Sequence, residues 1–163
     1  MEIRQAGAVD LPTCTRLNGT VQELHAAAHP LLFQAAPDAA AIRGWFADFL
    51  AKPGASLLLG EGAGEPVGYI VGAVMRYPEN PFRHTFALGL VDQLTVVAGA
   101  QRRGHGERLL AALLAISRAA GVTRVELSVW AFNAGARRFS ERQGFATCNE
   151  RMGRDLAPAL PAR

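Results

Sequence analysis

The chain has 163 residues, half of them hydrophobic, and a formal net charge of +3, which is enough apolar material for one domain with a full core. Its charge is uneven, because residues 1–81 carry 5 basic and 8 acidic side chains (net −3) and residues 82–163 carry 12 and 6 (net +6). The arginines are scattered and few aromatic residues lie between them, which argues against nucleic-acid binding and favours an anionic small molecule.

Targeting signals and cysteine motifs are not found in the sequence. Residues 1–4 reach polar side chains at once, and no apolar run approaches the length of a membrane span. Cys14 and Cys148 lie far apart and match neither a metal-binding spacing nor a C-x-x-C pair, so they predict small buried thiols. We therefore expect a cytoplasmic protein without a membrane partner and without a bound metal.

The first half of the chain predicts a short strand, two helices and a hairpin. Residues 3–5 form the strand, and a proline near the first helical position starts a helix over Leu11–Ala28, which ends before a proline. An amphipathic pattern predicts a second helix over 38–52. Two apolar, β-branched runs at 56–60 and 66–77 flank a glycine-rich turn and predict the hairpin.

The second half alternates strands and helices. It predicts strands over 85–97, 124–130 and 145–155, with helices over 104–120 and 133–143 between them. This order indicates a single-domain, mixed α/β protein with helices on the faces of its sheet. We expect the domain to span residues 1–157 and residues 158–163 to form a loose tail.

A glycine-rich turn over residues 101–106 joins the strand at 85–97 to the following helix. Gly104 and Gly106 lack a Cβ atom, so an anion can approach the backbone where the N–H groups of a helix start point outward. Arg102 and Arg103 add positive charge beside the turn, and His105 lies inside it. The alternatives are a pyrophosphate-binding loop and a simple exposed connection, and neither of the two common nucleotide-loop patterns is matched.

Two spaced motifs give this turn a more specific interpretation. Gln101, Gly104 and Gly106 match the pattern [QR]-x-x-G-x-[GA], and a second motif follows at Asn133, Ala136 and the pair 144–145. With these motifs, residues 86–156 resemble the GNAT superfamily of acyl-CoA-dependent N-acetyltransferases. The resemblance implies a mostly antiparallel central sheet of about six to seven strands, flanked by about four helices, and acetyl-CoA as the co-substrate.

The resemblance also implies which residues bind acetyl-CoA. The backbone amides of the loop would hold the pyrophosphate, and these belong to Arg102, Arg103, Gly104, His105, Gly106 and Glu107. Val96 would offer its backbone to the thioester and the pantetheine, with Leu94 two residues back on the same face. Asn133 would hydrogen-bond the pantetheine arm, and its alternative role is a helix N-cap.

Catalytic candidates are fewer. Asp92, four residues before Val96 and expected on the same face, is our first general base, and its alternative role is to pair with an arginine or order a turn. Glu126, two residues before Ser128, is the second base. Ser140 occupies the position where many relatives carry a tyrosine that protonates the leaving thiolate, and a serine hydroxyl is a far poorer acid.

The expected function is N-acetyl transfer from acetyl-CoA to a primary amine of a small molecule, peptide or protein, by direct attack in a ternary complex. The alternative is a non-catalytic acyl-CoA-binding or sensor module, motivated by Ser140. His25, His29 and His84 are further proton-transfer candidates whose usual role is at the surface or in packing. A homodimer through the last strand or the hairpin edge is compatible with such a fold.

Overall fold

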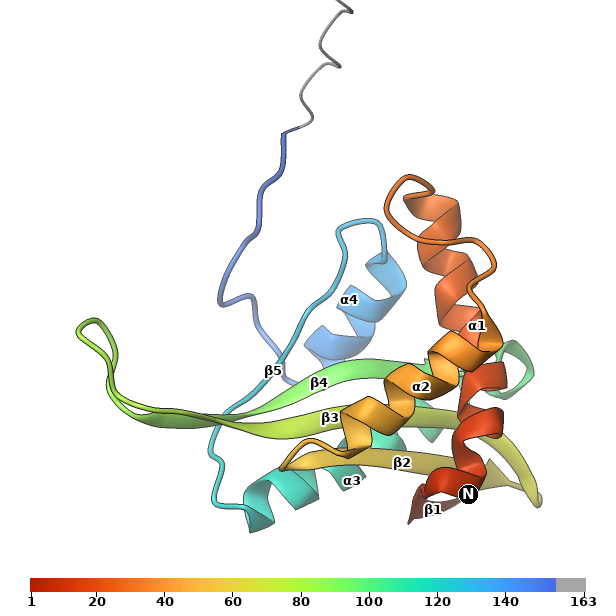
Figure 1. Ribbon diagram of the computed structural model, residues 1–163, viewed down its shortest axis with the longest axis horizontal. Helices are drawn as coiled ribbons and strands as arrows, with labels where there is room; N and C mark the ends of the chain where they lie inside the picture. Colours follow the sequence, from red (N-terminus) through yellow and green to blue (C-terminus); the bar gives the residue numbers. More distant parts are fainter. Residues whose placement is uncertain (155–163) are drawn as a thin grey trace, which may run out of the picture.

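The computed structural model describes residues 1–154, and these form one sheet with helices on both faces (Figure 1). Five strands make up the sheet: β1 (Glu2–Gln5), β2 (Ala55–Gly62), β3 (Glu65–Tyr77), β4 (Phe86–Val96) and β5 (Val125–Leu127). The α-helices are α1 (Leu11–Ala28), α2 (Ala39–Leu50), α3 (His105–Ala119) and α4 (Ala134–Arg142). Two short 3-10 turns complete the order, η1 (Ala8–Asp10) before α1 and η2 (Ala98–Ala100) after β4.

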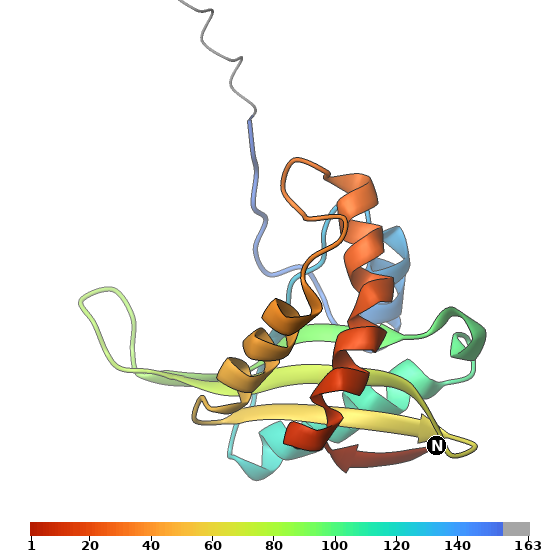
Figure 2. The ribbon, with the colours of Figure 1, turned by 45° about the vertical axis from the view of Figure 1, so that its right-hand side comes forward.

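The strands lie in the sheet in the same order as in the sequence. All neighbours are antiparallel except β4 and β5, which are parallel because α3 crosses between them. Helices α1 and α2 cover one face, and α3 and α4 lie on the other (Figures 1 and 2). The mixed, mostly antiparallel sheet flanked by helices confirms the expected fold class.

Each face of the sheet has its own apolar core. On the face of α1 and α2, Leu17, Phe46 and Tyr69 are almost completely buried. On the other face, Leu109 and Leu113 of α3 pack against the sheet. Burial of apolar surface on both faces provides the main driving force for folding.

Glycines on three neighbouring strands let α3 lie close to the sheet. A Cβ atom on Gly72 would lie 2.6 Å from Leu113 Cδ2, and one on Gly89 would lie 2.7 Å from Ser117 Oγ. Gly60 stands opposite Leu109 in the same way, at 3.4 Å. These contacts recur every four residues along α3, so one face of the helix lies over the three glycines.

An ion-paired carboxylate ties β1 to the start of α1. Asp10 accepts two hydrogen bonds from the Arg4 guanidinium, at 2.7 and 2.9 Å, and one from the Gly7 N–H at 2.9 Å. These bonds, chiefly those of Arg4, lower the pKa of Asp10 to about 2. Arg4 also donates to Glu61 of β2, so three elements meet at one guanidinium.

The structure corrects several details of the expected fold. The described chain contains five strands rather than six to seven, because residues 145–154 form no strand. Strand β5 is present but covers three residues instead of seven. Cys14 is buried, and burial raises its pKa to about 11, but Cys148 is exposed, contrary to the prediction. The predicted tail at 158–163 lies outside the described residues. Within the described residues, no helix is both long and apolar enough to cross a lipid bilayer.

Candidate functional site

The neighbouring strands β4 and β5 separate halfway along β4. They pair only at three positions, which join residues 89–91 of β4 to residues 125–127 of β5. After Leu127 the chain leaves the sheet toward α4, whereas β4 continues to Val96. Among residues 1–154, the second half of β4 therefore has a strand partner on the β3 side only.

The pairing register of β3 and β4 shows which backbone groups of β4 face its unpaired edge. Val97 donates its N–H to the carbonyl of Val67 at 2.9 Å, and hydrogen-bonded and non-hydrogen-bonded pairs alternate along antiparallel strands. The amides of Leu94 and Val96 consequently point away from β3, toward the gap left by β5. The carbonyl of Val96 accepts a hydrogen bond from Gln101 Nε2 at 3.0 Å, so its N–H is the group left to bind a ligand.

The glycine-rich turn opens α3 beside this edge. Gly104 is the N-cap residue, with a left-handed φ of 78°, and its own carbonyl accepts the N–H of Arg108 at 3.1 Å. The amides of residues 104–107 have no hydrogen-bond acceptor within the described part of the chain. A helix start with several free N–H groups is the arrangement that binds phosphate, so the loop fits a pyrophosphate.

Close contacts bring the helix start, β4 and α4 together. A Cβ atom on Gly106 would lie 3.6 Å from the Phe139 ring of α4 and 3.8 Å from Val96 Cγ2. His105 lies next to the end of β2, with its Cε1 at 3.9 Å from a Cβ placed on Gly62, and its buried Nδ1 has no partner among the described residues. The predicted acetyl-CoA residues of the loop and of β4 therefore share one region.

Asn133 caps α4 at the other side of the gap. Its Oδ1 accepts the N–H of Ala136 at 2.9 Å, and its own N–H donates to Trp130 at 2.8 Å. The helix N-cap role considered from the sequence is confirmed. The Nδ2 group is not used in these bonds, which is compatible with the predicted contact to a pantetheine arm.

Asp92 occupies a β-bulge. Val71 pairs with Gln93 while Gly72 pairs with Val91, so Asp92 is the unpaired extra residue. Val91, Leu94 and Val96 all pack on the α3 side. The bulge lies between Val91 and Gln93 and interrupts the alternation of side chains there, so the four-residue spacing of Asp92 and Val96 no longer predicts that they share a face.

The Asp92 carboxyl remains solvent-accessible but is partly desolvated. Desolvation raises its pKa, and the positive charge of Lys52 lowers it. A carboxylate at a bulge, with a raised pKa and water access, has the properties of a general base. Asp92 therefore remains our first candidate for the general base.

The other two catalytic candidates are more constrained, because one is ion-paired and the other is buried. Glu126 lies opposite Leu90 in the sheet, and its Oε1 accepts a hydrogen bond from Arg124 Nε at 2.6 Å. Ser140 is 6% exposed and lies within α4, and its neighbour Phe139 supplies the ring beneath Gly106. Both roles remain predictions.

A ring cluster joins the end of α1 to the segment before α4. His25 lies 4.9 Å from Phe33 and 5.5 Å from Phe132 between ring centroids, and Trp130 packs on His29 at 5.5 Å. Figure 1 shows both segments rising on the same side of β4. The sequence drew attention to the two histidines, but not to this cluster, because its members are far apart along the chain.

A buried polar network connects α1 to the bulge. Asn18 donates to the hydroxyl of Tyr69 at 3.0 Å and to Gln93 Oε1 at 3.2 Å, and Tyr69 donates to the same oxygen at 2.7 Å. Burial raises the pKa of Tyr69, so the phenol stays protonated. The sequence signal for this network was a polar residue on the apolar face of α1, which our sequence analysis missed.

Comparisons with known proteins agree with this geometry. The family model described as "Acetyltransferase (GNAT) family" matches residues 19–145, and a search of curated proteins found no match. A mutant of the BH1408 protein from Bacillus halodurans is similar in structure, with a TM-score of 0.90 and 22% identity over 96% of this chain and 100% of that one.

Two aminoglycoside acetyltransferases are similar as well. The apo enzyme AAC(6')-IG from Acinetobacter haemolyticus has a TM-score of 0.75 and 13% identity, over 98% of this chain and 100% of its own. AAC(6')-Iy in complex with a CoA-acetylneamine bisubstrate analogue has a TM-score of 0.74 and 15% identity, over 96% and 97%. The structures support the fold, the family model covers more than half of the sequence, and the chain belongs to the GNAT family of acetyltransferases.

Proposed function

We propose that the chain transfers an acetyl group from acetyl-CoA to a primary amine in a ternary complex. The observation that carries this proposal is the adjacency of two sets of free N–H groups. The amides at the start of α3 suit a pyrophosphate, and the N–H groups of Leu94 and Val96 face the gap beside them. Asn133 caps α4, the helix that follows β5 in the chain.

In this proposal the backbone supplies the electrostatic part of catalysis. The N–H of Val96 donates to the thioester oxygen as negative charge develops on it, and a strand amide is already oriented for that task. The carbonyl oxygen of Val96, which would repel this charge, accepts a hydrogen bond from Gln101 Nε2 at 3.0 Å. A fixed donor of this kind typically lowers the activation free energy by about 3 kcal/mol.

Asp92 supplies the base. The amine nitrogen forms a bond to the carbonyl carbon, the carbon–sulfur bond breaks, and the proton of the amine passes to the Asp92 carboxylate directly or through water. The departing thiolate takes a proton from water, because Ser140 is a poor acid and Phe139 has no proton to give. Asp92 therefore has to be ionised before reaction, and rates should rise with pH as its carboxyl loses its proton.

The acceptor is an amine of a small molecule or a peptide. Two fold neighbours are aminoglycoside N-acetyltransferases by name, which supports the small-molecule class. A sensor that binds acyl-CoA without turnover is the second candidate, and the buried serine at position 140 favours it.

Amine-dependent release of thiol from acetyl-CoA tests the proposal, with mass spectrometry of the pooled amines. The acetyl transferase predicts free CoA and an acetylated amine in equal amounts, both reduced in the Asp92→Asn variant. Binding of acetyl-CoA without thiol release from any pool would favour the sensor.

A further inference from the structure

A groove of about 440 Å³ lies between α1, the segment 35–37 and the start of α2. One side of it follows a single face of α1, through residues 12, 15, 16, 19, 22 and 23, and the other side is made by residues 39, 42 and 43 of α2. None of the predicted acetyl-CoA residues lines it. The groove is therefore a second concave surface with its own chemistry.

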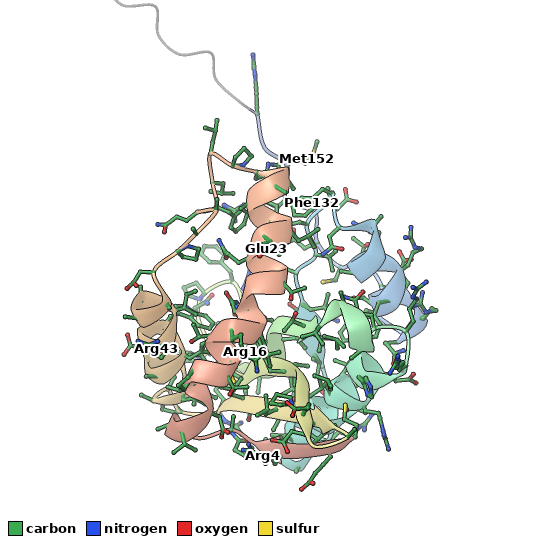
Figure 3. All side chains as sticks on the ribbon, turned by 90° about the vertical axis from the view of Figure 1, so that its right-hand side faces the viewer. Arg4, Arg16, Glu23, Arg43, Phe132 and Met152 are labelled. Atoms are coloured by element: carbon green, nitrogen blue, oxygen red, sulfur yellow. The ribbon has the colours of Figure 1, made fainter. Side chains whose placement is uncertain are left out.

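Two arginines line this groove from opposite sides. Arg16 comes from α1 and Arg43 from α2, as Figure 3 shows. Both are exposed, and neither forms an ion pair within residues 1–154. Two free guanidinium groups on facing helices favour a carboxylate or a phosphate, which arginine binds through paired N–H donors.

A buried hydroxyl beside Arg16 has unused hydrogen-bonding capacity. Thr15 lines the groove, and its Oγ1 is buried without a partner in the described chain. A buried hydroxyl without a partner costs free energy, and an anion bound next to it would accept its proton. This donor is independent of the arginine pair, because it is a neutral hydroxyl of a separate residue on α1.

The start of α2 adds partial positive charge. The 12-residue helix begins at Ala39, which lines the groove. Asp38 caps it by accepting the N–H groups of Ala41 and Ile42, and the amides of residues 39 and 40 have no acceptor among the described residues. These amides, like the arginines and the hydroxyl, are donors.

Two acidic groups lie at or beside the groove, because Glu23 is one of its lining residues and Asp38 directly precedes Ala39. Glu23 lies seven residues after Arg16 on α1 (Figure 3), which is about 10 Å farther along the helix axis. The Asp38 carboxylate is already engaged at the helix cap. The arginine end of the groove is consequently the end that suits an anion.

The groove is also linked to the candidate active site. Asn18 lines it and donates to Gln93, the residue directly after Asp92 in the bulge. An occupant of the groove would therefore contact a side chain that is one hydrogen bond away from β4. This link would allow one ligand to reach both places or a bound ligand to affect the bulge.

We propose that this groove binds the anionic group of a small molecule, a carboxylate or a phosphate, between Arg16 and Arg43 with the Thr15 hydroxyl as a further donor. The anionic group belongs either to the amine acceptor or to a separate ligand, and its chemistry is the same in both cases. Binding at the groove does not depend on the proposed acetyl transfer, because it uses none of the same residues.

Residue-resolved NMR of the labelled full-length chain, titrated with succinate and separately with inorganic phosphate, tests the site. We expect saturable shifts at the amides of Gly19 and Ala39 in the wild type. Arg16→Gln and Arg43→Gln should each weaken this binding at least tenfold, whereas the exposed control Arg118→Gln should leave it unchanged. Melting curves of each variant verify that it is folded.

A variant of the same shape tests the contribution of the Thr15 hydroxyl separately from the shape of the groove. Thr15→Val removes the donor and keeps the branched side chain, and it should weaken binding severalfold. Shifts confined to the amides of residues 104–107 would show that the anions bind only the loop before α3, and would overturn the proposal. Equal binding by the wild type and both arginine variants, or tighter binding of spermidine than of succinate, would overturn it too.

Paired amines distinguish the source of the anion and separate the two proposals. Each pair carries a carboxylate in one member and a carboxamide in the other, and thiol release from acetyl-CoA is measured with both. If thiol release is faster with the carboxylate amine and this preference disappears in Arg16→Gln, the groove binds the acceptor. If both amines give equal rates of thiol release while succinate still causes NMR shifts at the groove, the groove binds a separate ligand. NMR shifts at the groove without any release of thiol contradict only the acetyl transfer. Release of thiol without NMR shifts at the groove contradicts only the anion site.

Discussion

The side-chain amide of Gln101 donates a hydrogen bond to the backbone carbonyl of Val96 at 3.0 Å. This contact holds the turn before α3 against the last residue of β4. It engages the only Val96 group that would repel a developing oxyanion, and it leaves the Val96 N–H facing the gap beside β5. One glutamine thus couples the proposed pyrophosphate loop to the proposed oxyanion donor.

Replacing this glutamine should weaken the site without unfolding the protein. Gln101→Ala removes one hydrogen bond, worth about 1 kcal/mol, so the KM for acetyl-CoA should rise about fivefold. Gln101→Glu should raise the KM further, since an ionised carboxylate cannot donate to a carbonyl and would repel the pyrophosphate. Steady-state kinetics measure the effect, and an unchanged KM in both variants would contradict the coupling.

Gly104 and Gly121 provide a matched pair of substitutions. Both have a left-handed φ, 78° and 77°, and a Cβ added at either meets no atom within 4 Å. Alanine at each position should therefore cost a similar 1–2 kcal/mol of stability. Only Gly104→Ala should also weaken acetyl-CoA binding, by tenfold or more, because its methyl group enters the loop. Calorimetry with both variants measures this, and equal affinities would argue against the loop assignment.

Asp92→Asn tests the proposed base. The variant keeps the size of the side chain and removes proton acceptance, so kcat should fall by about a hundredfold to ten-thousandfold. In the wild type, kcat/KM should rise with pH through the pKa of Asp92, which desolvation raises above its usual range. A kcat within threefold of the wild type would exclude Asp92 as the base.

The same substitution should not reduce stability at neutral pH. Because the pKa of Asp92 is raised in the folded state, the folded chain binds more protons than the unfolded chain between the two pKa values. Stability due to this group therefore falls as pH rises through that window. Urea unfolding at pH 7 should find Asp92→Asn at least as stable as the wild type, and a lower stability would mean that the carboxylate makes a structural contact.

Ser140→Ala should change turnover by less than about threefold, because a serine hydroxyl is too weak an acid to protonate a thiolate efficiently. Because Ser140 is buried in α4, the melting temperature of the variant is measured as the control for stability. If kcat instead falls about a hundredfold while the melting temperature is unchanged, Ser140 takes part in proton transfer.

Asp10 should make the fold sensitive to acid. Arg4 and Gly7 lower the Asp10 pKa from 3.8 to about 2, so the ionised group contributes stability above about pH 4 that is lost as pH falls toward 2. Asp10→Asn should be less stable than the wild type at pH 7 and show a flatter acid dependence, whereas the exposed Asp48→Asn should match the wild type. Identical acid profiles for Asp10→Asn and the wild type would contradict this account.

Local patterns predicted most of the elements correctly. The proline at position 12 and the His29–Pro30 pair predicted α1 with its exact bounds, and apolar periodicity predicted α3 and the β2–β3 hairpin. The loop at 101–106 was recognised because its motif is contiguous in the sequence. These features depend on interactions within a few residues, which is the range that periodicity and turn chemistry describe.

Features that depend on distant contacts were missed. The bulge at Asp92 depends on how β3 pairs with β4, and the residues of β4 alone do not specify which of them is left without a partner on β3. Residues 128–130 leave the sheet, and Trp130 packs against the end of α1. The predicted strand at 145–155 had only weak alternation, and its described part forms no pairing within residues 1–154.

Acetyl-CoA titration followed by residue-resolved NMR tests whether acetyl-CoA binds along the open edge of β4 with its pyrophosphate at the start of α3. We expect saturable binding with the largest shifts at the amides of Gly104 to Glu107 and at Leu94 and Val96. Shifts located elsewhere with these amides unmoved, or no binding at all, would contradict it.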